Sequence, residues 1–170
     1  MLATHKANHD TLPAYCKAKV VILGVGNILF GDDGFGPEVA NYLINHYAIP
    51  DDTYVMDVGT GVRKLLFTIT LSDVKPEEIV VVDAVDWGQD IGSLSLMSAA
   101  ELPTSKVDDF SLHQLPTSNL LCELQEDCGV KVTVVACDVS VMPGTIRPGL
   151  SNAVQRAVLA AAQLIADRYF

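Results

Sequence analysis

Residues 20–43, VVILGVGNILFGDDGFGPEVANYL, decide how the chain begins to fold. Residues 19–25 are nearly all β-branched or leucine, which predicts a strand buried on both faces. Glycines and two adjacent aspartates, Asp32 and Asp33, follow the strand, and Pro37 fits the first position of a helix. A glycine-rich turn between a strand and a helix often binds phosphate, so the two carboxylates need an explanation.

The turn does not match the known phosphate-binding patterns. Gly24 and Gly26 begin a G-x-G-x-x-G pattern, but Leu29 replaces its third glycine, and no lysine followed by serine or threonine ends the loop. Asp32 and Asp33 would also repel a phosphate. At ~4 Å and an effective dielectric of ~20, each like-charge contact costs about 4 kcal/mol, which exceeds the usual contribution of a helix dipole. The sequence therefore predicts a cation as the ligand.

The composition indicates a folded chain with one domain. About half of the 170 residues are apolar, and we expect a loose leader over residues 1–18 and a single α/β domain over residues 19–170. No apolar run reaches the ~20 residues that span a bilayer.

The net charge of −10 leads us to expect neither nucleic acid nor a membrane as a partner. The four cysteines form no C-x-x-C pair, which predicts free thiols and a cytoplasmic location.

Strand and helix patterns alternate along the chain. The predicted strands cover residues 19–25, 53–57, 79–84, 91–97 and 130–136, the fourth of them at an edge. Helices are expected after Pro37, over residues 62–69, from Pro116 and after Ser151, which caps a last helix whose predicted buried face holds Val154, Ala157, Val158, Ala161, Leu164 and Ile165. The alternation predicts a three-layer α/β/α sandwich with a mostly parallel, twisted sheet of about five strands.

Acidic residues lie at the ends of the first three predicted strands: Asp33 after the first, Asp57 at the second, and Asp83 and Asp86 at the third. Ligands of an open parallel sheet bind beyond the carboxyl ends of its strands, so we expect these carboxylates along one edge. A charge at the end of a buried strand is costly without a partner, which favours a metal-binding role for Asp33 with Asp83. Asp32 is better explained as a helix cap or turn residue.

Histidine could add a softer ligand to this acidic edge. His113 lies in FSLHQLPTSN, just before the helix expected from Pro116, where a loop could return it to the carboxylates. As an isolated residue, His113 is better explained as an ordinary surface or core histidine, so its role as a ligand depends on the carboxylates. Two carboxylates and one imidazole would form a mixed oxygen and nitrogen site that suits nickel, zinc or cadmium, without choosing among them.

Four stretches of the sequence stand out together: GVGNILFGDDGFGPEVANYL at 24–43, DVGTG at 57–61, VVVDAVDWG at 80–88 and SLHQ at 111–114. With these stretches, the sequence resembles a known family, the hydrogenase maturation endopeptidases. They occur in the family's order and at similar spacing, and the likeness covers roughly residues 19–165. The first block is specific, and the other three are supportive.

The resemblance implies a function. Members cleave a C-terminal extension from the large-subunit precursor of a nickel–iron hydrogenase after metal insertion, and they recognise the nickel that the precursor already holds. The family's ligands and catalytic residues fall here on Asp33, Asp83 and His113, and zinc or cadmium can take the nickel position in crystals. Asp57 matches a further carboxylate near the site. The stretch FSLHQLPTSNLL is most similar to the branch that serves the deazaflavin-reducing hydrogenases of methanogens.

Several alternatives remain open at this level. The reaction could use a water activated by the metal, or Asp33 as a carboxylate base while the metal positions the substrate. Cys137 and Asp138 replace a Gln-Pro pair of many members, and Cys137 is either a nucleophile or a buried structural thiol, the latter favoured because no histidine motif adjoins it. Two other functions compete: a metal-dependent amidase acting on small molecules with its own zinc, and a flavodoxin-like binding module.

Overall fold

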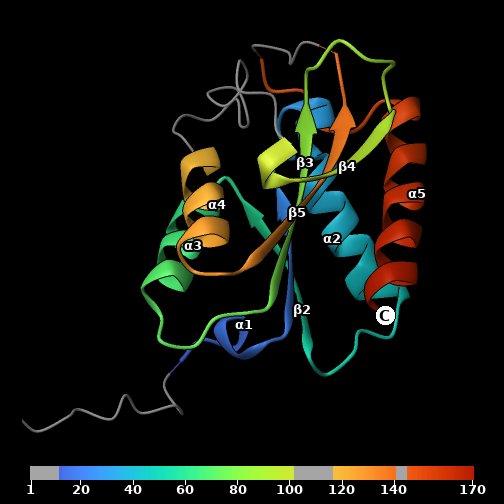
Figure 1. Ribbon diagram of the computed structural model, residues 1–170. Helices are drawn as coiled ribbons and strands as arrows, with labels where there is room; N and C mark the ends of the chain where they lie inside the picture. Colours follow the sequence, from blue (N-terminus) through green and yellow to red (C-terminus); the bar gives the residue numbers. More distant parts are fainter. Residues whose placement is uncertain (1–11, 102–116, 141–144) are drawn as a thin grey trace, which may run out of the picture.

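Five strands form one sheet in the order β2-β1-β3-β5-β4 (Figure 1). The computed structural model describes residues 12–101, 117–140 and 145–170. The strands are β1 (Val20–Val25), β2 (Thr53–Gly59), β3 (Glu78–Val85), β4 (Leu94–Ser98) and β5 (Lys131–Asp138). Only β4 among them is antiparallel to its neighbour, and it lies at an edge. The predicted α/β class with a mostly parallel sheet of five strands is confirmed.

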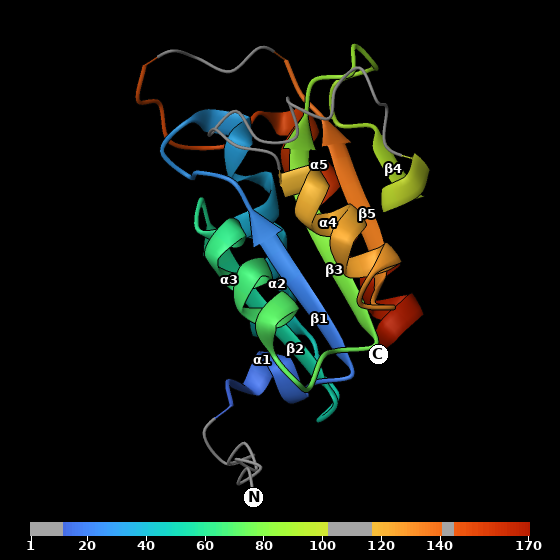
Figure 2. The ribbon, with the colours of Figure 1, turned by 60° about the vertical axis from the view of Figure 1, so that its left-hand side comes forward.

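Helices cover both faces of the sheet (Figures 1 and 2). The short helices are α1 (Ala14–Lys17) and the 3₁₀ turns η2 (Gly31–Gly34) and η3 (Ala99–Glu101). The longer helices are α2 (Phe35–His46), α3 (Val62–Leu71), α4 (Thr117–Glu126) and α5 (Asn152–Tyr169). Helices α3 and α4 pack on one face of the sheet, and α2 and α5 pack on the other. None of the helices in the described part of the chain combines the length and the apolar character needed to cross a membrane.

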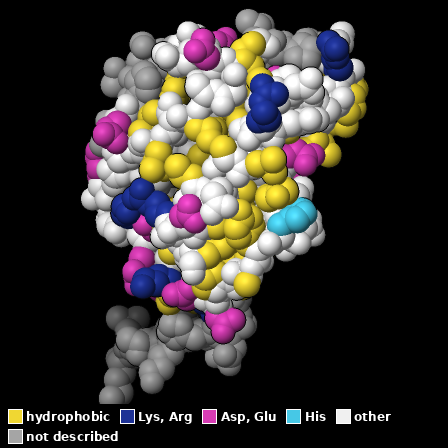
Figure 3. Space-filling model, turned by 90° about the vertical axis from the view of Figure 1, so that its right-hand side faces the viewer, with side chains coloured by type: hydrophobic (Ala, Val, Ile, Leu, Met, Phe, Trp, Pro, Cys, Tyr) yellow, Lys and Arg dark blue, Asp and Glu magenta, His cyan; other side chains and the backbone are white. Residues whose placement is uncertain are grey.

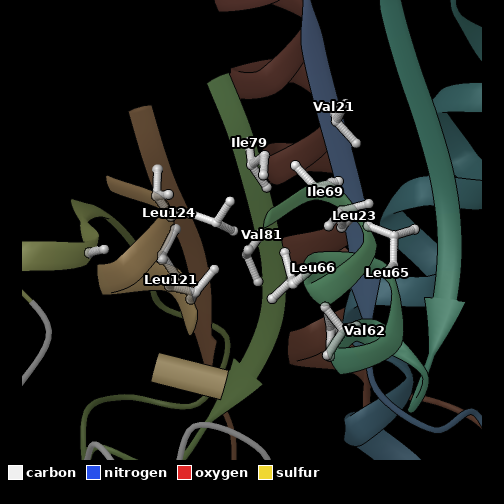
Figure 4. Close-up of a cluster of buried hydrophobic side chains, with 14 of the residues drawn as sticks. Val21, Leu23, Val62, Leu65, Leu66, Ile69, Ile79, Val81, Leu121 and Leu124 are labelled. Atoms are coloured by element: carbon white, nitrogen blue, oxygen red, sulfur yellow. The ribbon is translucent and has the colours of Figure 1, made fainter. Parts of the chain in front are cut away.

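Two clusters of buried side chains fill the space between the layers. The cluster under α3 and α4 joins Val62, Leu65, Leu66 and Ile69 of α3 to inward-facing strand residues such as Leu23 and Val81 (Figure 4). The other cluster lies between the sheet and α2 with α5, and includes Phe35, Leu43 and Ile165. These four residues of α3 are all buried, which confirms the helix predicted over residues 62–69.

Several predicted boundaries shift by a few residues. Helix α2 begins at Phe35 rather than at Pro37, because the turn η2 runs directly into it. A proline fits this third position because the first N–H groups of a helix have no partner within it. The edge strand begins at Leu94 rather than at residue 91. Leu164, predicted to be buried on α5, is exposed and was assigned wrongly, since the exposed and buried faces of α5 meet there.

The outer side of α2 and α5 exposes apolar side chains between charged ones (Figure 3). The large exposed hydrophobic residues of these helices and the chain end are Ile44, Leu159, Leu164 and Phe170. At the end of α2, the ring of Tyr42 stacks on that of His46 with centroids 4.1 Å apart. The hydroxyl of Tyr47 donates to Gln163 of α5 at 3.2 Å, which ties the ends of the two helices together.

The segment predicted as a loose leader contains structure within its described residues. Ala14–Lys17 form the one-turn helix α1, and Cys16 is completely buried in the cluster under α3 and α4. The ring of Tyr15 meets that of Tyr54 edge to face at 6.3 Å. Tyr15, Cys16 and Ala18 therefore pack against the core of the domain, while residues 1–11 lie outside the described part.

A glycine pair allows α2 to approach the sheet more closely than any side chain permits. A Cβ atom added to Gly36 would lie 2.2 Å from the carbonyl oxygen of Val25 and 2.3 Å from that of Val82. A Cβ added to Gly24 of β1 would lie 2.3 Å from the carbonyl oxygen of Gly36. The beginning of α2 therefore rests directly on the ends of β1 and β3, and this contact fixes where the preceding turn η2 lies.

At the opposite end of the sheet, the carboxylate of Glu78 joins β3, β5 and α5. It accepts hydrogen bonds from the hydroxyls of Thr133 and Tyr169, both at 2.6 Å, and from the ammonium of Lys131 at 2.9 Å. Partial burial raises the pKa of Glu78, but the hydrogen bonds outweigh burial and hold this pKa below its ordinary value. The same contact and burial raise the pKa of the Tyr169 hydroxyl to about 12.

We expect Gly36→Ala to lower the free energy of unfolding by about 3 kcal/mol, because the new methyl group would overlap backbone oxygens that cannot move independently. Urea unfolding followed by circular dichroism measures the change. Gly61→Ala is the control, since its φ is −89° and its Cβ would meet no atom closer than 3.2 Å; we expect a loss below about 1 kcal/mol. Equal losses in both variants would contradict the close packing of α2.

We expect Glu78→Gln to lower the free energy of unfolding by about 1–3 kcal/mol at pH 7. Because the folded state lowers the pKa of Glu78, its stabilisation is full above the unfolded pKa and is lost as the pH falls through the folded pKa. The difference between wild type and variant should therefore shrink below about pH 4. Glu77→Gln, at the exposed neighbour, should cost less than about 1 kcal/mol at any pH. A pH-independent difference for Glu78→Gln would argue against the ionic role.

Candidate active site

The turn after β1 buries Asp33. Gly26 has φ 136°, and a Cβ atom there would lie 1.9 Å from the carbonyl oxygen of Asp33, so the loop folds tightly back on η2. The backbone N–H of Asn27 donates to Oδ2 of Asp33 at 2.8 Å. Asp33 is only 4% exposed, although it lies in a turn. The glycines thus serve to hold a carboxylate at the end of β1, and the loop is not a phosphate cradle.

Asp83 lies near the carboxyl end of β3, the strand next to β1. It is 2% exposed, and its Oδ1 accepts the backbone N–H of Ala84 at 2.9 Å. Burial raises the pKa of Asp83 well above its ordinary value, and the negative charge of Asp33 raises it further. The two aspartates that the sequence analysis singled out are therefore buried and electrostatically coupled at one edge of the sheet.

This pair of carboxylates has the character of a cation site. Two buried negative charges repel each other, and a divalent cation between them would remove both the repulsion and much of the desolvation cost. Carboxylate oxygens are suitable ligands for borderline divalent ions when an imidazole joins them. No three metal-ligating side chains gather among the described residues. The third predicted ligand, His113, lies outside those residues, so its position stays a prediction.

The other acidic residues predicted at this edge, Asp57 and Asp86, are exposed and do not belong to the buried pair. Asp57 is exposed at the end of β2, and its Oδ1 accepts the N–H of Gly59 at 2.8 Å. It lines a pocket of about 200 Å³ together with Asn27, whose backbone N–H holds Asp33. Asp86 is exposed beyond β3. Asp57 is therefore an exposed neighbour of the loop that holds Asp33 and is not a member of the buried pair.

Asp32 has a structural contact. Its Oδ1 accepts the backbone N–H of Ser151 at 2.6 Å, and the hydroxyl of Ser151 in turn accepts the N–H of Val154 at the start of α5. Asp32 was expected to cap the helix that follows it or to shape the turn. The structure places Asp32 in the η2 turn, as expected. Its side chain does not cap α2, which has no side-chain cap, and instead binds the residue that precedes α5.

Cys137 is a buried thiol that the protein keeps protonated. Its side chain is completely buried at the end of β5. Burial, with the nearby charges of Asp32 and Asp138, raises the pKa of the thiol to about 12. Because the thiolate is the nucleophilic form of cysteine, the structure supports the reading of Cys137 as a structural thiol.

Asp138 is a buried residue at the end of β5 that the sequence analysis left without a role. It is 3% exposed, and its Oδ2 accepts the N–H of Trp87 at 3.1 Å, while its backbone pairs with Gly92 and Ser93. It therefore orders the loop that follows β3, next to Asp83. The signal that could have found it is the one that identified Asp83, a charged residue at the end of an apolar strand.

The fold and the acidic pair define an α/β protein with an enzyme-like site beyond the carboxyl ends of parallel strands. Comparison with known proteins narrows the class. The HycI family, hydrogenase maturation protease, matches residues 37–168. A Methanocaldococcus jannaschii protein named for the same protease activity is 38% identical over 88% of this chain and 95% of its own. The delta subunit of coenzyme F420 hydrogenase from Methanothermobacter thermautotrophicus is 32% identical over 88% of this chain and 94% of its own.

Solved structures of hydrogenase maturation proteases have the same fold as this chain. The nickel–iron hydrogenase maturation protease HycI of Thermococcus kodakarensis has a TM-score of 0.68 at 27% identity, covering 89% of this chain and 92% of that chain. The hydrogenase maturating endopeptidase HybD of E. coli has a TM-score of 0.69 at 26% identity, covering 88% and 91%. The chain belongs to the hydrogenase maturation protease family and is a peptidase. These findings favour the endopeptidase over the amidase and the binding module.

We expect Asp83→Asn to make the protein more stable at pH 7. Because the folded state raises the pKa of Asp83, its contribution to stability falls as the pH rises from about 4 through the folded pKa, and this cost persists at neutral pH. An uncharged amide removes the cost and can still accept the N–H of Ala84. The urea midpoint should rise at pH 7 and approach that of wild type below about pH 4.

The matched control is Asp73→Asn, at an exposed aspartate after α3, for which we expect no change in the urea midpoint at either pH. A lower midpoint for Asp83→Asn at pH 7 would mean that the carboxylate of Asp83 stabilises the folded protein, contrary to the repulsion described above.

Proposed function

We propose that this protein removes the C-terminal extension from the large-subunit precursor of a nickel–iron hydrogenase after metal insertion, and that Asp33, Asp83 and His113 contact the nickel held by that precursor. The observation that carries the proposal is the burial of Asp33 and Asp83 close enough for one charge to raise the pKa of the other. Such a pair is costly in the free enzyme and is relieved when a cation arrives. Membership of the hydrogenase maturation proteases supports the choice of substrate.

The donor set fits a metal that enters with the substrate. Asp33 and Asp83 supply oxygen and His113 would supply nitrogen, whereas Cys137 stays protonated and offers no thiolate. Resident structural zinc is usually held by four ligands, often cysteines, so three ligands of this kind form a weak cage. Zinc or cadmium would suit the same donors and could replace nickel in a crystal.

The residues suggest two roles in hydrolysis. A divalent ion in the site would lower the pKa of a bound water and polarise the scissile carbonyl. Asp33 and Asp83 would position that ion, and Asp33, held by the N–H of Asn27, could take the proton of the attacking water as a general base. In that second case the protein would act as an aspartate-dependent peptidase.

The client in this proposal is a deazaflavin-reducing hydrogenase. The support is the similarity to a chain named as the delta subunit of coenzyme F420 hydrogenase, which extends over nearly all of both proteins. The net charge of −10 argues against nucleic acid and anionic membranes as partners. All four cysteines are free, which is consistent with the predicted cytoplasmic location.

The test is to mix the enzyme with nickel-loaded precursor and to follow loss of the extension by mass spectrometry. We expect Asp33→Asn, Asp83→Asn and His113→Ala to fold but to reduce processing by at least about 10³-fold, since each removes a contact to the metal or to the reacting groups. Apo-precursor should not be cleaved. Asp32→Asn, at the adjacent rim aspartate, should lower stability and leave processing within about threefold of wild type.

The rival functions have their own signatures in the same preparation. One tightly held zinc per purified chain would favour an amidase, and a nucleotide retained on purification would favour a binding module. Cleavage of apo-precursor at the wild-type rate would count against recognition of nickel.

A further inference from the structure

A hollow of about 520 Å³ beside the first turn of α3 lies outside the carboxylate pair. It is lined by Thr60, Gly61, Arg63, Lys64 and Phe67. Arg63 and Lys64 are the only two adjacent basic residues in the sequence, whose net charge is −10. Both are exposed, and neither pairs with an acidic side chain in the described part of the chain. The hollow therefore presents two cationic groups on a predominantly acidic protein.

An aromatic side chain adds apolar surface to the same hollow. Phe67 lies one turn after Arg63 on α3, on the same side of the helix, and is 54% exposed. Aromatic residues and arginine are enriched in surfaces that bind another chain. The combination fits a ligand that carries both a carboxylate and an apolar side chain.

The hollow adjoins a smaller pocket beside the loop that holds Asp33. Thr60 lines both the hollow and the pocket of about 200 Å³ that contains Asn27 and Asp57. The loops after β1 and β2 are joined by a hydrogen bond from the N–H of Gly26 to the carbonyl of Gly59 at 3.1 Å, and Figure 2 shows them side by side. A peptide that passes from this pocket into the hollow would run from the loop that holds Asp33 to Arg63 and Lys64.

Resting on the proposed function, we propose that this hollow binds an acidic, apolar segment of the precursor's C-terminal extension. The mature part of the precursor is anchored by its nickel. The extension has no metal contact and therefore needs a binding site of its own. Cleavage is efficient only if the chain is positioned on both sides of the scissile bond. Carboxylates in the extension are repelled by the buried acidic pair and by the exposed Asp57 and are attracted by Arg63 and Lys64, so the acidic residues of the extension lie at the hollow, beyond Asp57.

The charge in this proposal is tested with Arg63→Gln/Lys64→Gln acting on nickel-loaded precursor. We expect kcat/KM to fall about tenfold through a higher KM, with kcat within twofold of wild type, because the contacts bind the substrate without touching the reacting atoms. The KM of wild type should rise with salt, and that of the variant should not. The control Lys17→Gln/Arg156→Gln removes two exposed charges elsewhere and should retain the wild-type KM and salt dependence.

A charge swap gives a second readout. Arg63→Glu/Lys64→Glu should process the native precursor poorly, and replacing the acidic residues of the extension with lysine should restore its kcat/KM to within threefold of wild type. Absence of this rescue would overturn the proposed pairing.

The apolar part is tested by Phe67→Ala, which should raise KM about threefold. Leu71→Ala is the matched control, since Leu71 is an exposed apolar residue of the same helix, 69% exposed, that does not line the hollow. Equal effects of the two variants would overturn the role of Phe67.

The experiment separates the two proposals. If wild-type enzyme fails to cleave nickel-loaded precursor, the proposed function and the docking site both fall. If wild type cleaves it and Arg63→Gln/Lys64→Gln shows the same KM and salt dependence, the docking site alone is overturned.

Discussion

The structure depends on the close approach of α2 to the sheet at Gly36. The backbone there lies so near the carbonyl oxygens of Val25 and Val82 that no side chain fits, and Gly24 provides the matching space on β1. This contact places the η2 turn over the ends of two adjacent strands. Asp33 consequently lies within electrostatic reach of Asp83, although fifty positions separate them in the sequence.

The carboxylates of Asp33 and Asp83 repel each other, and the fold holds them close together despite this repulsion. Burial and the charge of Asp33 raise the pKa of Asp83, so the two carboxylates cost stability that the rest of the fold must supply. Two packed core clusters and the Glu78 contacts at the opposite end of the sheet contribute that stability. Such a carboxylate pair favours a cation, because a divalent ion between the two carboxylates would remove their repulsion.

Much of this arrangement was predictable from the sequence. The apolar runs of β1, β3 and β5 and the spacing of Val62, Leu65, Leu66 and Ile69 have clear periods, and the aspartates at strand ends follow from the geometry of parallel sheets. Other features depend on tertiary contacts that no local pattern records. The side chain of Asp32 serves α5, across the sequence, and Cys16 of the expected leader is buried against the sheet. The position of Leu164 was missed because its helical spacing puts it at the border of the buried face.

The most direct test of the central claim is a ¹³C NMR titration of the carboxyl groups of Asp33 and Asp83 in the metal-free protein. The account predicts that Asp83 titrates well above the ordinary range of about 4, and that its pKa falls in the Asp33→Asn variant, because the neighbouring charge is gone. If Asp83 titrates in the ordinary range and does not respond to Asp33→Asn, the two carboxylates do not form one site, and the proposed contact with nickel loses its physical basis.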